Sequence, residues 1–208
     1  MKTNNNTKSY RDYFQKYGIS YKSLKWNTKI AQAVRYRELL KDLDLKGKSI
    51  LDFGCGMGDI VPVISANTQD FEYLGVDVVP EFIVVAREAY KIRTGDRHKI
   101  KIDFSVRDLL KKSLRKIFDV VLSSGALNSN VIDALEYRKK AIKILWNHAR
   151  EVLAFNMSGG YPQPENSKKY RVFYANSMEI LEYCLTLTSK IIFRHHYRKR
   201  DFTIIMYR

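Results

Sequence analysis

The most constraining feature of this 208-residue chain is the stretch SILDFGCGMGDI, residues 49–60. A short apolar run ends at Asp52 and is followed by three glycines at every second position, Gly54, Gly56 and Gly58. This pattern predicts a strand, a tight loop and a helix. Glycines allow a ligand to approach the loop backbone closely, and the first turn of the helix offers N–H groups without helical partners. The pattern therefore favours a site for a nucleotide-like cofactor.

Acidic residues around the loop indicate which cofactor it is. Asp52 closes the strand and Asp59 lies in the first turn of the helix, where the two carboxylates would repel a pyrophosphate. Asp77 ends the next apolar run at about the distance expected of an acid that binds ribose hydroxyls. S-adenosylmethionine has a cationic amine, a ribose and no phosphate, so it fits all three acids. A glycine turn that only joins two core strands is the alternative interpretation.

Length and composition suit one α/β domain with a short extension, since 45% of the residues are hydrophobic. We expect residues 1–47 to form an N-terminal helical extension and residues 48–208 to form the domain. No stretch approaches the roughly 20 apolar residues of a membrane span, and the first residues lack a signal-peptide core. A cytoplasmic protein without a membrane partner is therefore expected. The two cysteines, Cys55 and Cys184, do not form a metal or disulfide pattern, and no metal site is expected.

The N-terminal extension is rich in aromatic and basic residues. Residues 1–8 are polar, and we expect them to be disordered. Helices are expected over residues 9–17 and over about 28–43. The apolar face of the second helix is expected to contain Ile30, Ala33, Val34 and Leu40. The extension is expected to act as a lid over the cofactor or acceptor site, or alternatively as a plain cap on a sheet edge.

The rest of the chain alternates apolar runs with amphipathic stretches. Strands are expected at residues 49–53, 71–76, 101–106, 119–123 and 151–157, with helices between them. The last two apolar segments, residues 190–197 and 202–207, are separated by a short basic turn and predict an antiparallel hairpin. The expected fold is α/β, a Rossmann-like doubly wound seven-stranded sheet, mostly parallel with an antiparallel last strand.

In these features the sequence resembles the class I S-adenosylmethionine-dependent methyltransferases. The similarity covers about residues 49–208 and is carried by LDFGCGMGD, LGVD and DVVLSSGALN. The resemblance implies S-adenosylmethionine as the methyl donor and S-adenosylhomocysteine as the product. It also implies which residues bind the cofactor. The glycine loop contributes Asp52, Gly54, Cys55, Gly56 and Gly58, and Asp77 binds the ribose with Val78 beside the adenine. The tip of the third strand contributes Asp108 and Leu109, and the end of the fourth strand contributes Ser123 and Ser124.

More narrowly, the chain is similar to small bacterial methyltransferases with an aromatic and basic N-terminal segment. Here that segment contains Trp26, Gln32, Arg35 and Tyr36. The same proteins have an FNM element after the fifth strand, matched by Phe155, Asn156 and Met157, and a Tyr-Ala pair before the last helix, matched by Tyr174 and Ala175. Those proteins often have His-Asp-Tyr in the sixth strand, whereas this chain has His195, His196 and Tyr197. The missing acid leaves the role of that position open.

The candidate catalytic residues are few. Asn128 and Asn156 follow central strands, where ligands of open α/β sheets bind, although they could equally cap loops. His195 and His196 are candidate bases, but alternation in a strand lets at most one face the site, and either could be a surface residue. Arg35 could bind the cofactor carboxylate or an anionic acceptor, or form a lid salt bridge. Side chains that could line the acceptor pocket are Tyr10, Tyr13, Trp26 and Tyr174.

The net charge of +15 raises the question of a nucleic-acid partner. Lys and Arg outnumber Asp and Glu by 37 to 22, but they lie in separate clusters, and motifs that grip a base amine or attack a pyrimidine ring are missing. We therefore expect methylation of oxygen or nitrogen in a small metabolite, with anionic metabolites included. An RNA methyltransferase that uses its basic surface is one alternative, and a non-catalytic binding scaffold is another. The sequence does not indicate the oligomeric state.

Overall fold

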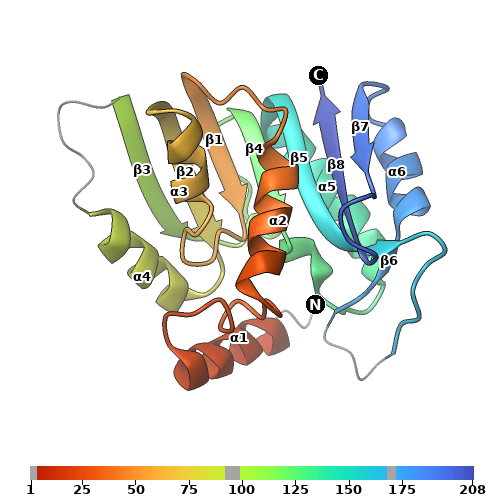
Figure 1. Cartoon of the computed structure of the whole chain (residues 1–208), viewed down its shortest axis with the longest axis horizontal. Helices are drawn as coiled ribbons and strands as arrows, with labels where there is room; N and C mark the ends of the chain where they lie inside the picture. Colours follow the sequence, from red (N-terminus) through yellow and green to blue (C-terminus); the bar gives the residue numbers. More distant parts are fainter. Residues whose placement is uncertain (1–3, 92–98, 168–171) are drawn as a thin grey trace.

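The computed structural model describes residues 4–91, 99–167 and 172–208. Its strands form one sheet in the order β3-β2-β1-β4-β5-β8-β7, with the short β6 beside β5 (Figure 1). The strands are β1 (Lys48–Phe53), β2 (Asp70–Asp77), β3 (Lys99–Val106), β4 (Phe118–Ser124), β5 (Ala149–Gly160), β6 (Ala175–Asn176), β7 (Ile191–Arg194) and β8 (Asp201–Tyr207). Strand β8 pairs antiparallel with β5 and β7, while β1 to β5 pair in parallel. The predicted mostly parallel fold with an antiparallel last strand is confirmed.

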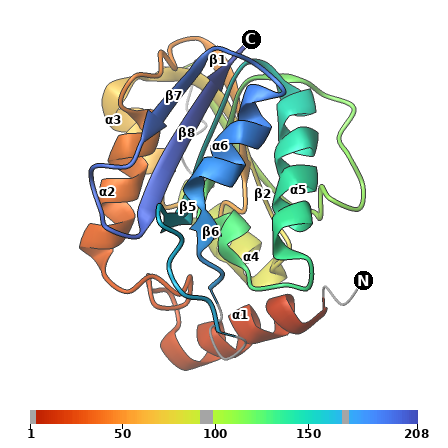
Figure 2. The same cartoon turned by 90° about the vertical axis from the view of Figure 1, so that its right-hand side faces the viewer.

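Helices cover both faces of this sheet (Figures 1 and 2). They are α1 (Asn4–Tyr17), α2 (Lys29–Leu40), α3 (Val61–Asn67), α4 (Pro80–Tyr90), α5 (Ala134–His148) and α6 (Ser177–Leu185), with a short 3₁₀ turn η1 (Ala126–Asn128). One apolar core joins α2, α3 and α4 to one face, and a second joins α5 and α6 to the other. In the described chain, no helix is both long and apolar enough to cross a membrane.

The central strands are apolar on both faces because each face has its own core. Neighbouring residues point to opposite sides of a strand, so Ile50 lies in the core with α2 and α3, while Leu51 lies in the core with α5 and α6. Val120 and Val121 of β4 divide in the same way. Continuous apolar runs of this kind are typical of parallel strands covered on both sides.

Helix α2 buries a different face from the one predicted. Thr28 caps its first turn by accepting a hydrogen bond from the Ala31 N–H at 3.0 Å. Of the predicted apolar face, Leu40 is buried as expected, but Ile30 is 74% exposed and Ala33 is exposed, whereas Glu38 is buried. A carboxylate can be buried here because Arg37 pairs with it at 3.1 Å, and hydrophobic periodicity does not detect such a contact.

Helix α1 begins earlier than expected and lies across the carboxyl ends of the parallel strands (Figure 1). The expected disorder is wrong for residues 4–8, which are helical, while residues 1–3 lie outside the described residues. The sequence also places Ile92 and Gly95 at the end of α4, and they lie outside the described residues too. The division at residue 47 stays a prediction, although α2 shares an apolar core with the sheet.

Candidate functional site

The loop between β1 and α3 has a shape that glycine permits. Gly54, Gly56 and Gly58 have φ angles of +73°, +55° and +80°, in the left-handed region that most other residues avoid. The loop is fixed to the sheet because the N–H groups of Gly54 and Cys55 both donate to the carbonyl of Val76, at 2.8 and 3.1 Å. It therefore presents a defined backbone surface at the carboxyl end of β1.

Asp77 ends β2 beside this loop. Its carboxylate accepts hydrogen bonds from the N–H of Gly56 at 3.0 Å and from the N–H of Val79 at 2.9 Å. Burial raises the pKa of Asp77, and these backbone donors offset part of that rise. Each oxygen keeps a lone pair for another donor, which suits a pair of ribose hydroxyls. The neighbouring Val78 is 39% exposed at the rim of the site.

Asp52 lies beneath the loop and is buried. The hydroxyl of Tyr73 donates to its carboxylate at 2.7 Å. Burial raises the pKa of Asp52 to about 7, the Tyr73 hydrogen bond works against that rise, and the charge of Asp77 adds to it. Because Asp52 and Asp77 are buried near each other and carry the same charge when ionised, they favour a bound cation beside the glycine loop.

Helix α2 is tied to the glycine loop through polar side chains. The amide nitrogen of Gln32 donates to Asp59 at 2.8 Å and to the hydroxyl of Tyr36 at 3.2 Å. Burial raises the pKa of Tyr36 well above its ordinary value, and the charges of Asp59 and Asp52 raise it further. The N-terminal segment thus contributes directly to the surroundings of both loop acids.

The N-terminal segment also lies over the loop. The rings of Tyr10 and Phe14 pack edge-on against Phe82 of α4, with centroids 6.1 and 5.8 Å apart. Leu24 covers the loop, because a Cβ on Gly56 would lie 2.7 Å from its Cδ2. Burial raises the pKa of Tyr10 to about 12, and the charge of Asp77 contributes. Tyr13 instead packs against Tyr17, at 5.6 Å between ring centroids.

The carboxyl end of β4 connects to α2 through a hydrogen-bonded relay. The hydroxyl of Ser124 donates to the side-chain Oδ1 of Asn156 at 3.2 Å, and Nδ2 of Asn156 donates to the backbone carbonyl of Arg35 at 3.2 Å. Asn156 is fully buried, and its amide bonds β4 at one end and holds α2 to the sheet at the other. Ser123 is also fully buried, and its hydroxyl has no hydrogen-bond partner in the described part of the chain.

Arg35 lies at the centre of a polar cluster. Its Nη2 pairs with Asp201 at the start of β8 and donates to the hydroxyl of Ser158 at 2.9 Å. Arg198 also pairs with Asp201, at 2.8 Å. The Arg35 guanidinium lies over the Trp26 ring, 4.8 Å from its centroid. The cluster therefore combines two cations with one buried carboxylate.

The turn after β4 is clamped to the segment that leads into β6. The Phe173 N–H donates to the carbonyl of Asn128 at 2.9 Å. Arg138 is fully buried, donates to the carbonyls of Ala134 and Ser129 at 2.6 and 3.0 Å, and lies over the Phe173 ring at 4.6 Å. Burial lowers the pKa of Arg138 to about 10. The position of Asn128 thus depends on this buried guanidinium.

The residues after β3 serve partly as structure. The Asp108 carboxylate accepts from the N–H of Leu110 at 3.1 Å and pairs with Lys111 at 3.6 Å. The Leu109 side chain lies in the core beneath α5. The Leu109 side chain is therefore not placed to contact a ligand, although its backbone and the Asp108 side chain lie at this edge.

The two histidines lie outside the strand in which they were predicted, because β7 ends at Arg194. The prediction that they alternate across a strand is therefore wrong. His195 stacks on Phe193 at 5.9 Å, and its Nε2 is buried with no hydrogen-bond partner in the described regions. The exposed His196 lies 3.9 Å from Glu38. Tyr174 is contacted by Arg200, which lies 5.3 Å from its ring centroid.

Ser158 and Asp201 belong to the cluster although the sequence did not point to them. They are register partners in the antiparallel pairing of β5 and β8. The apolar pattern predicts such a pairing but not its register, so no local signal brings a serine and an aspartate 43 positions apart to one arginine. Gly125 lies inside the SSGA motif, and no sequence pattern indicates that it lies beside Arg35.

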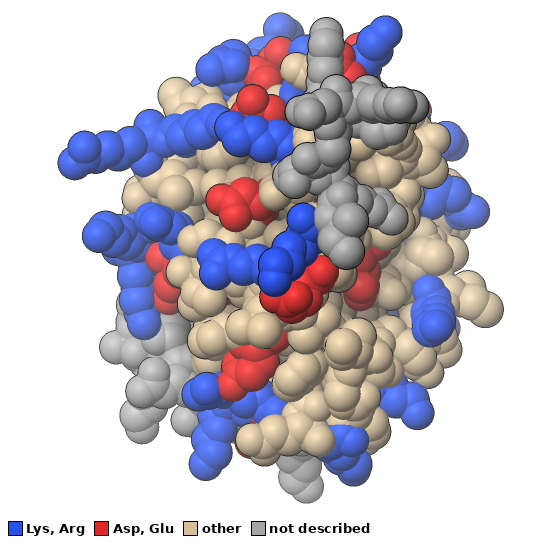
Figure 3. All heavy atoms as spheres, turned by 90° about the vertical axis from the view of Figure 1, so that its left-hand side faces the viewer, with Lys and Arg blue, Asp and Glu red and all other residues tan. Residues whose placement is uncertain are grey.

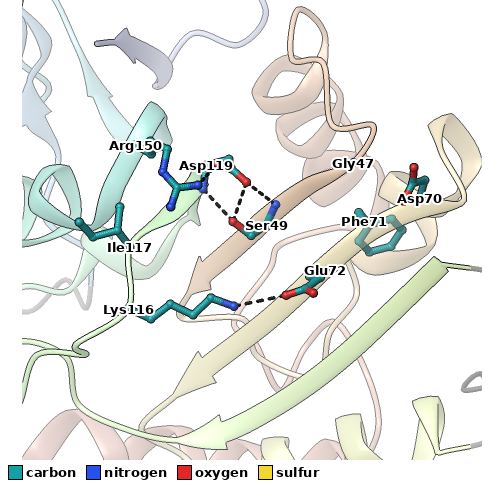
Figure 4. A pocket seen from close by; sticks show the side chains of 9 residues that line it. All are labelled: Gly47, Ser49, Asp70, Phe71, Glu72, Lys116, Ile117, Asp119 and Arg150. Atoms are coloured by element: carbon teal, nitrogen blue, oxygen red, sulfur yellow. Dashed lines mark hydrogen bonds and ion pairs between the residues drawn. The ribbon is translucent and has the colours of Figure 1, made fainter.

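A hollow of about 500 Å³ lies at the opposite edge of the sheet, near the amino ends of the parallel strands (Figure 4). It is lined by Gly47, Ser49, Asp70, Phe71, Glu72, Lys116, Ile117, Asp119 and Arg150. Ser49 and Arg150 both bond Asp119, and Lys116 pairs with Glu72 at 3.3 Å. Most of its charged groups thus have partners within the hollow itself.

The positive charge is distributed over the surface. On the face drawn in Figure 3, Lys and Arg lie at several separate places with Asp and Glu between them. Within residues 4–91, 99–167 and 172–208, no group of three or more His, Cys, Asp or Glu could hold a metal ion. These features do not outline a single basic groove on that face.

Residues 51–154, half of the chain, match the family described as "Methyltransferase domain". The chain belongs to this methyltransferase domain family. The match begins in β1 and ends in β5, so it contains the glycine loop, Asp77 and the end of β4. The resemblance drawn from the sequence is confirmed.

Named relatives and solved structures agree with the family. The chain is 30% identical over 95 residues to ribosomal protein L11 methyltransferase of Mannheimia succiniciproducens, which covers 40% of this chain and 32% of that protein. The chain spans 25% of the length of putative methyltransferase 235L of Invertebrate iridescent virus 6, and 32% and 41% of the length of two L11 methyltransferases. Magnesium protoporphyrin IX methyltransferase from Synechocystis PCC 6803 with bound SAH gives a TM-score of 0.67 at 15% identity over 99% of this chain and 95% of that chain.

A second solved structure covers nearly the whole chain. N-methyltransferase NodS from Bradyrhizobium japonicum WM9, in complex with S-adenosyl-L-homocysteine, gives a TM-score of 0.66 at 14% identity over 96% of this chain and 97% of that chain. At these identities the likeness shows the fold. The α1 and α2 region is included, because these alignments extend well beyond residues 51–154.

Proposed function

We propose that this protein transfers a methyl group from S-adenosylmethionine to oxygen or nitrogen of a small-molecule acceptor. The observation that supports it most directly is Asp77, whose carboxylate is fixed by the N–H groups of Gly56 and Val79 beside the glycine loop. The buried acid Asp52 adds negative charge where a cationic amine would lie. The residues present therefore fit the cofactor, and two solved neighbours are described as holding SAH.

In this proposal each part of the cofactor has its own residues. Asp77 binds the ribose hydroxyls, and Val78 and Asp108 lie around the adenine together with the backbone of Leu109. The loop from Gly54 to Gly58 holds the amino-acid part, and Ser123 and Ser124 lie toward the methyl group. The cofactor supplies an electrophilic methyl group on a sulfonium, and alignment of the acceptor with that methyl group provides much of the reduction in the activation barrier.

The cover over the loop supports a small acceptor. Three side chains of the N-terminal segment pack around this edge: Tyr10 on Phe82 of α4, Leu24 on the glycine loop and Trp26 on Tyr36 of α2. An acceptor as large as folded RNA or a protein needs an open surface at this edge. The name of the L11 methyltransferase relatives raises a protein acceptor as the second candidate, and the RNA alternative rests on the net charge.

Two measurements test the proposal. Calorimetric titration with S-adenosylhomocysteine is expected to show binding at one site. Incubation with tritium-labelled S-adenosylmethionine is expected to label molecules in a deproteinised cell extract, and not RNA or purified ribosomal proteins. Label confined to RNA or to protein would contradict a small acceptor, and cofactor binding without any transfer would favour the non-catalytic scaffold.

A further inference from the structure

A gap beside Gly125, the residue after β4, is bordered by three side chains from distant parts of the chain. A Cβ on Gly125 would lie 3.4 Å from Cη2 of Trp26 and 3.6 Å from both Nη1 of Arg35 and Nδ2 of Asn128. Gly125 has a φ of +75°, which a larger residue would adopt only with strain. The glycine therefore leaves a space that a cation, an amide nitrogen and an indole edge all reach.

This gap adjoins the glycine loop. The residue after Gly125 is Ala126, and a Cβ on Gly54 would collide with the Cβ of Ala126. Gly125, Asn128 and Trp26 are all half-buried, so the gap is not sealed inside the protein. A group bound there would lie next to the part of the loop assigned above to the cofactor.

The two polar groups at the gap are oriented from behind. Nη2 of Arg35 is held by Asp201 and Ser158, which fixes the guanidinium plane. The backbone N–H of Ser158 donates to the side-chain Oδ1 of Asn128 at 2.8 Å, so Nδ2 of Asn128 is the end turned toward the gap. Within the described residues, Nη1 of Arg35 and Nδ2 of Asn128 have no hydrogen-bond partner. The gap therefore presents donors and positive charge.

Two polar candidates around this cluster, Asp201 and Asn156, are bonded to other groups in the described part of the chain. Asp201 pairs with both Arg35 and Arg198. The amide of Asn156 is bonded at both ends. Nε2 of His195 has no hydrogen-bond partner in the described regions, but it is buried beside Gly160, and it is not among the atoms nearest to a Cβ on Gly125. An amine or hydroxyl acceptor would need a group that takes its proton. An acceptor that is already an anion needs none.

We propose that the gap binds the carboxylate of the acceptor, so that the product is a methyl ester. This inference rests on the function proposed above and narrows its substrate to a small carboxylic acid. Carboxylates are ionised at neutral pH, and Arg35 with Asn128 supplies charge-assisted hydrogen bonds to them. One carboxylate oxygen forms a bond to the methyl carbon, the bond from that carbon to the sulfonium sulfur breaks, and its electron pair stays on sulfur. No proton is released.

The chemical stability of the product tests this inference. The protein is incubated with tritium-labelled S-adenosylmethionine and a deproteinised cell extract, supplemented with benzoate and indole-3-acetate because the Trp26 edge suits planar acids. Methyl esters release volatile labelled methanol in alkali, whereas N-methyl and ether products do not. Alkali-labile label is the expected result. Alkali-stable label would overturn the carboxylate inference and leave methyl transfer itself intact, whereas no label would contradict the proposed function and this inference with it.

A matched pair of variants tests the gap. Asn128→Asp keeps the oxygen that Ser158 holds, but it replaces the donor at the gap by a second negative oxygen. Asn67→Asp makes the same change at the end of α3, where the amide donates to the Val63 carbonyl at 2.9 Å. Asn128→Asp is expected to lower alkali-labile transfer about 100-fold relative to Asn67→Asp. Equal transfer by both variants would overturn the proposal.

The cofactor has a carboxylate of its own, and a binding measurement separates the two sources. Calorimetric titration with S-adenosylhomocysteine is expected to give affinities within about twofold for Asn128→Asp, Asn67→Asp and the unchanged protein. A loss of affinity in Asn128→Asp as large as its loss of transfer would assign the gap to the cofactor carboxylate. That result would overturn the acceptor assignment.

Discussion

At the amino-terminal edge of the sheet, a hollow of about 500 Å³ is lined by charged groups that are paired with one another. At the carboxyl-terminal edge, the glycine loop is covered by Leu24, yet Asp52 and Asp77 have raised pKa values. The donors of Arg35 and Asn128 also converge there on Gly125. The first edge has a hollow whose charged groups are mostly paired, whereas at the second edge Nη1 of Arg35 and Nδ2 of Asn128 have no hydrogen-bond partner in the described residues. The proposed site therefore rests on unpartnered polar groups and not on the size of a hollow.

The largest expected effect separates the two edges directly. Asp77→Ala removes the carboxylate proposed to bind two ribose hydroxyls, and each hydrogen bond to a charged group is worth about 1.5–3 kcal/mol. The affinity for S-adenosylhomocysteine, measured by calorimetry, is expected to fall about a thousandfold. Asp119→Ala at the other edge is the control and should leave that affinity unchanged. Unchanged binding by Asp77→Ala would remove the ribose assignment.

A glycine pair compares backbone constraints at the two edges. Gly54 and Gly47 both have positive φ, +73° and +69°, but only a Cβ on Gly54 would collide with Ala126. The nearest atom to a Cβ on Gly47 is Oδ2 of Asp70, at 3.9 Å. Gly47→Ala is expected to lower the free energy of unfolding by about 1 kcal/mol through strain alone, and Gly54→Ala by about 3 kcal/mol. Urea denaturation checks both, and equal losses would show that the close approach at Gly54 is relieved without cost.

The pH dependence of stability sharpens the comparison through Asp52. Its folded pKa of about 7 lies above its ordinary value of 3.8, so the folded state holds this proton more tightly. Its stabilising contribution is therefore complete below pH 3.8 and is lost as the pH rises through 7. Between pH 5 and pH 8 the loss amounts to about 2.5 kcal/mol. Asp52→Asn should flatten this part of the pH profile of unfolding in urea.

At the other edge, the pKa of Asp119 is shifted in the opposite direction from that of Asp52, so its effect on the pH dependence of stability has the opposite sign. Partial burial acts to raise its pKa, but hydrogen bonds from Ser49 and Arg150 outweigh burial and hold the pKa below its ordinary value. Its contribution is present at neutral pH and is lost as the pH falls through its folded pKa. Asp119→Asn should therefore destabilise the protein at pH 8, where Asp52→Asn stabilises it. The same sign for both variants would contradict the contrast between the edges.

The smallest effect is expected at Cys55, which lies within the glycine loop. Its side chain is buried and a free thiol, and burial raises its pKa well above the ordinary value. Cys55→Ala is expected to change the affinity for S-adenosylhomocysteine by less than about twofold, because the loop contacts a ligand through its backbone. Calorimetric titration measures this, and a tenfold loss would show that the sulfur itself contributes.

Much of the fold could be predicted because it depends on local patterns. Apolar runs located the central strands, and glycines at alternate positions located the loop. The antiparallel hairpin followed from two apolar segments around a basic turn. Asp77 was found because the loop and the next strand set its position at the carboxyl edge, where parallel strands end together.

The rest depends on contacts between distant residues. The buried face of α2 carries Gln32 and Glu38, which an apolar pattern assigns to solvent. Ser158 and Asp201 meet Arg35 only because β5 and β8 pair in one particular register. His195 and His196 lie outside the strand because β7 ends at Arg194, immediately before them. Each of these outcomes is decided by pairing energies that no short stretch of sequence contains.

The buried guanidinium of Arg138 has a consequence for how this protein can be re-engineered. It contacts both the turn that carries Asn128 and the ring of Phe173, so one side chain holds together two segments that are far apart in the sequence. A graft that exchanges only one of them between homologous scaffolds would separate the turn from its clamp. An exchange of this turn between homologous proteins therefore requires moving both segments together with their shared arginine.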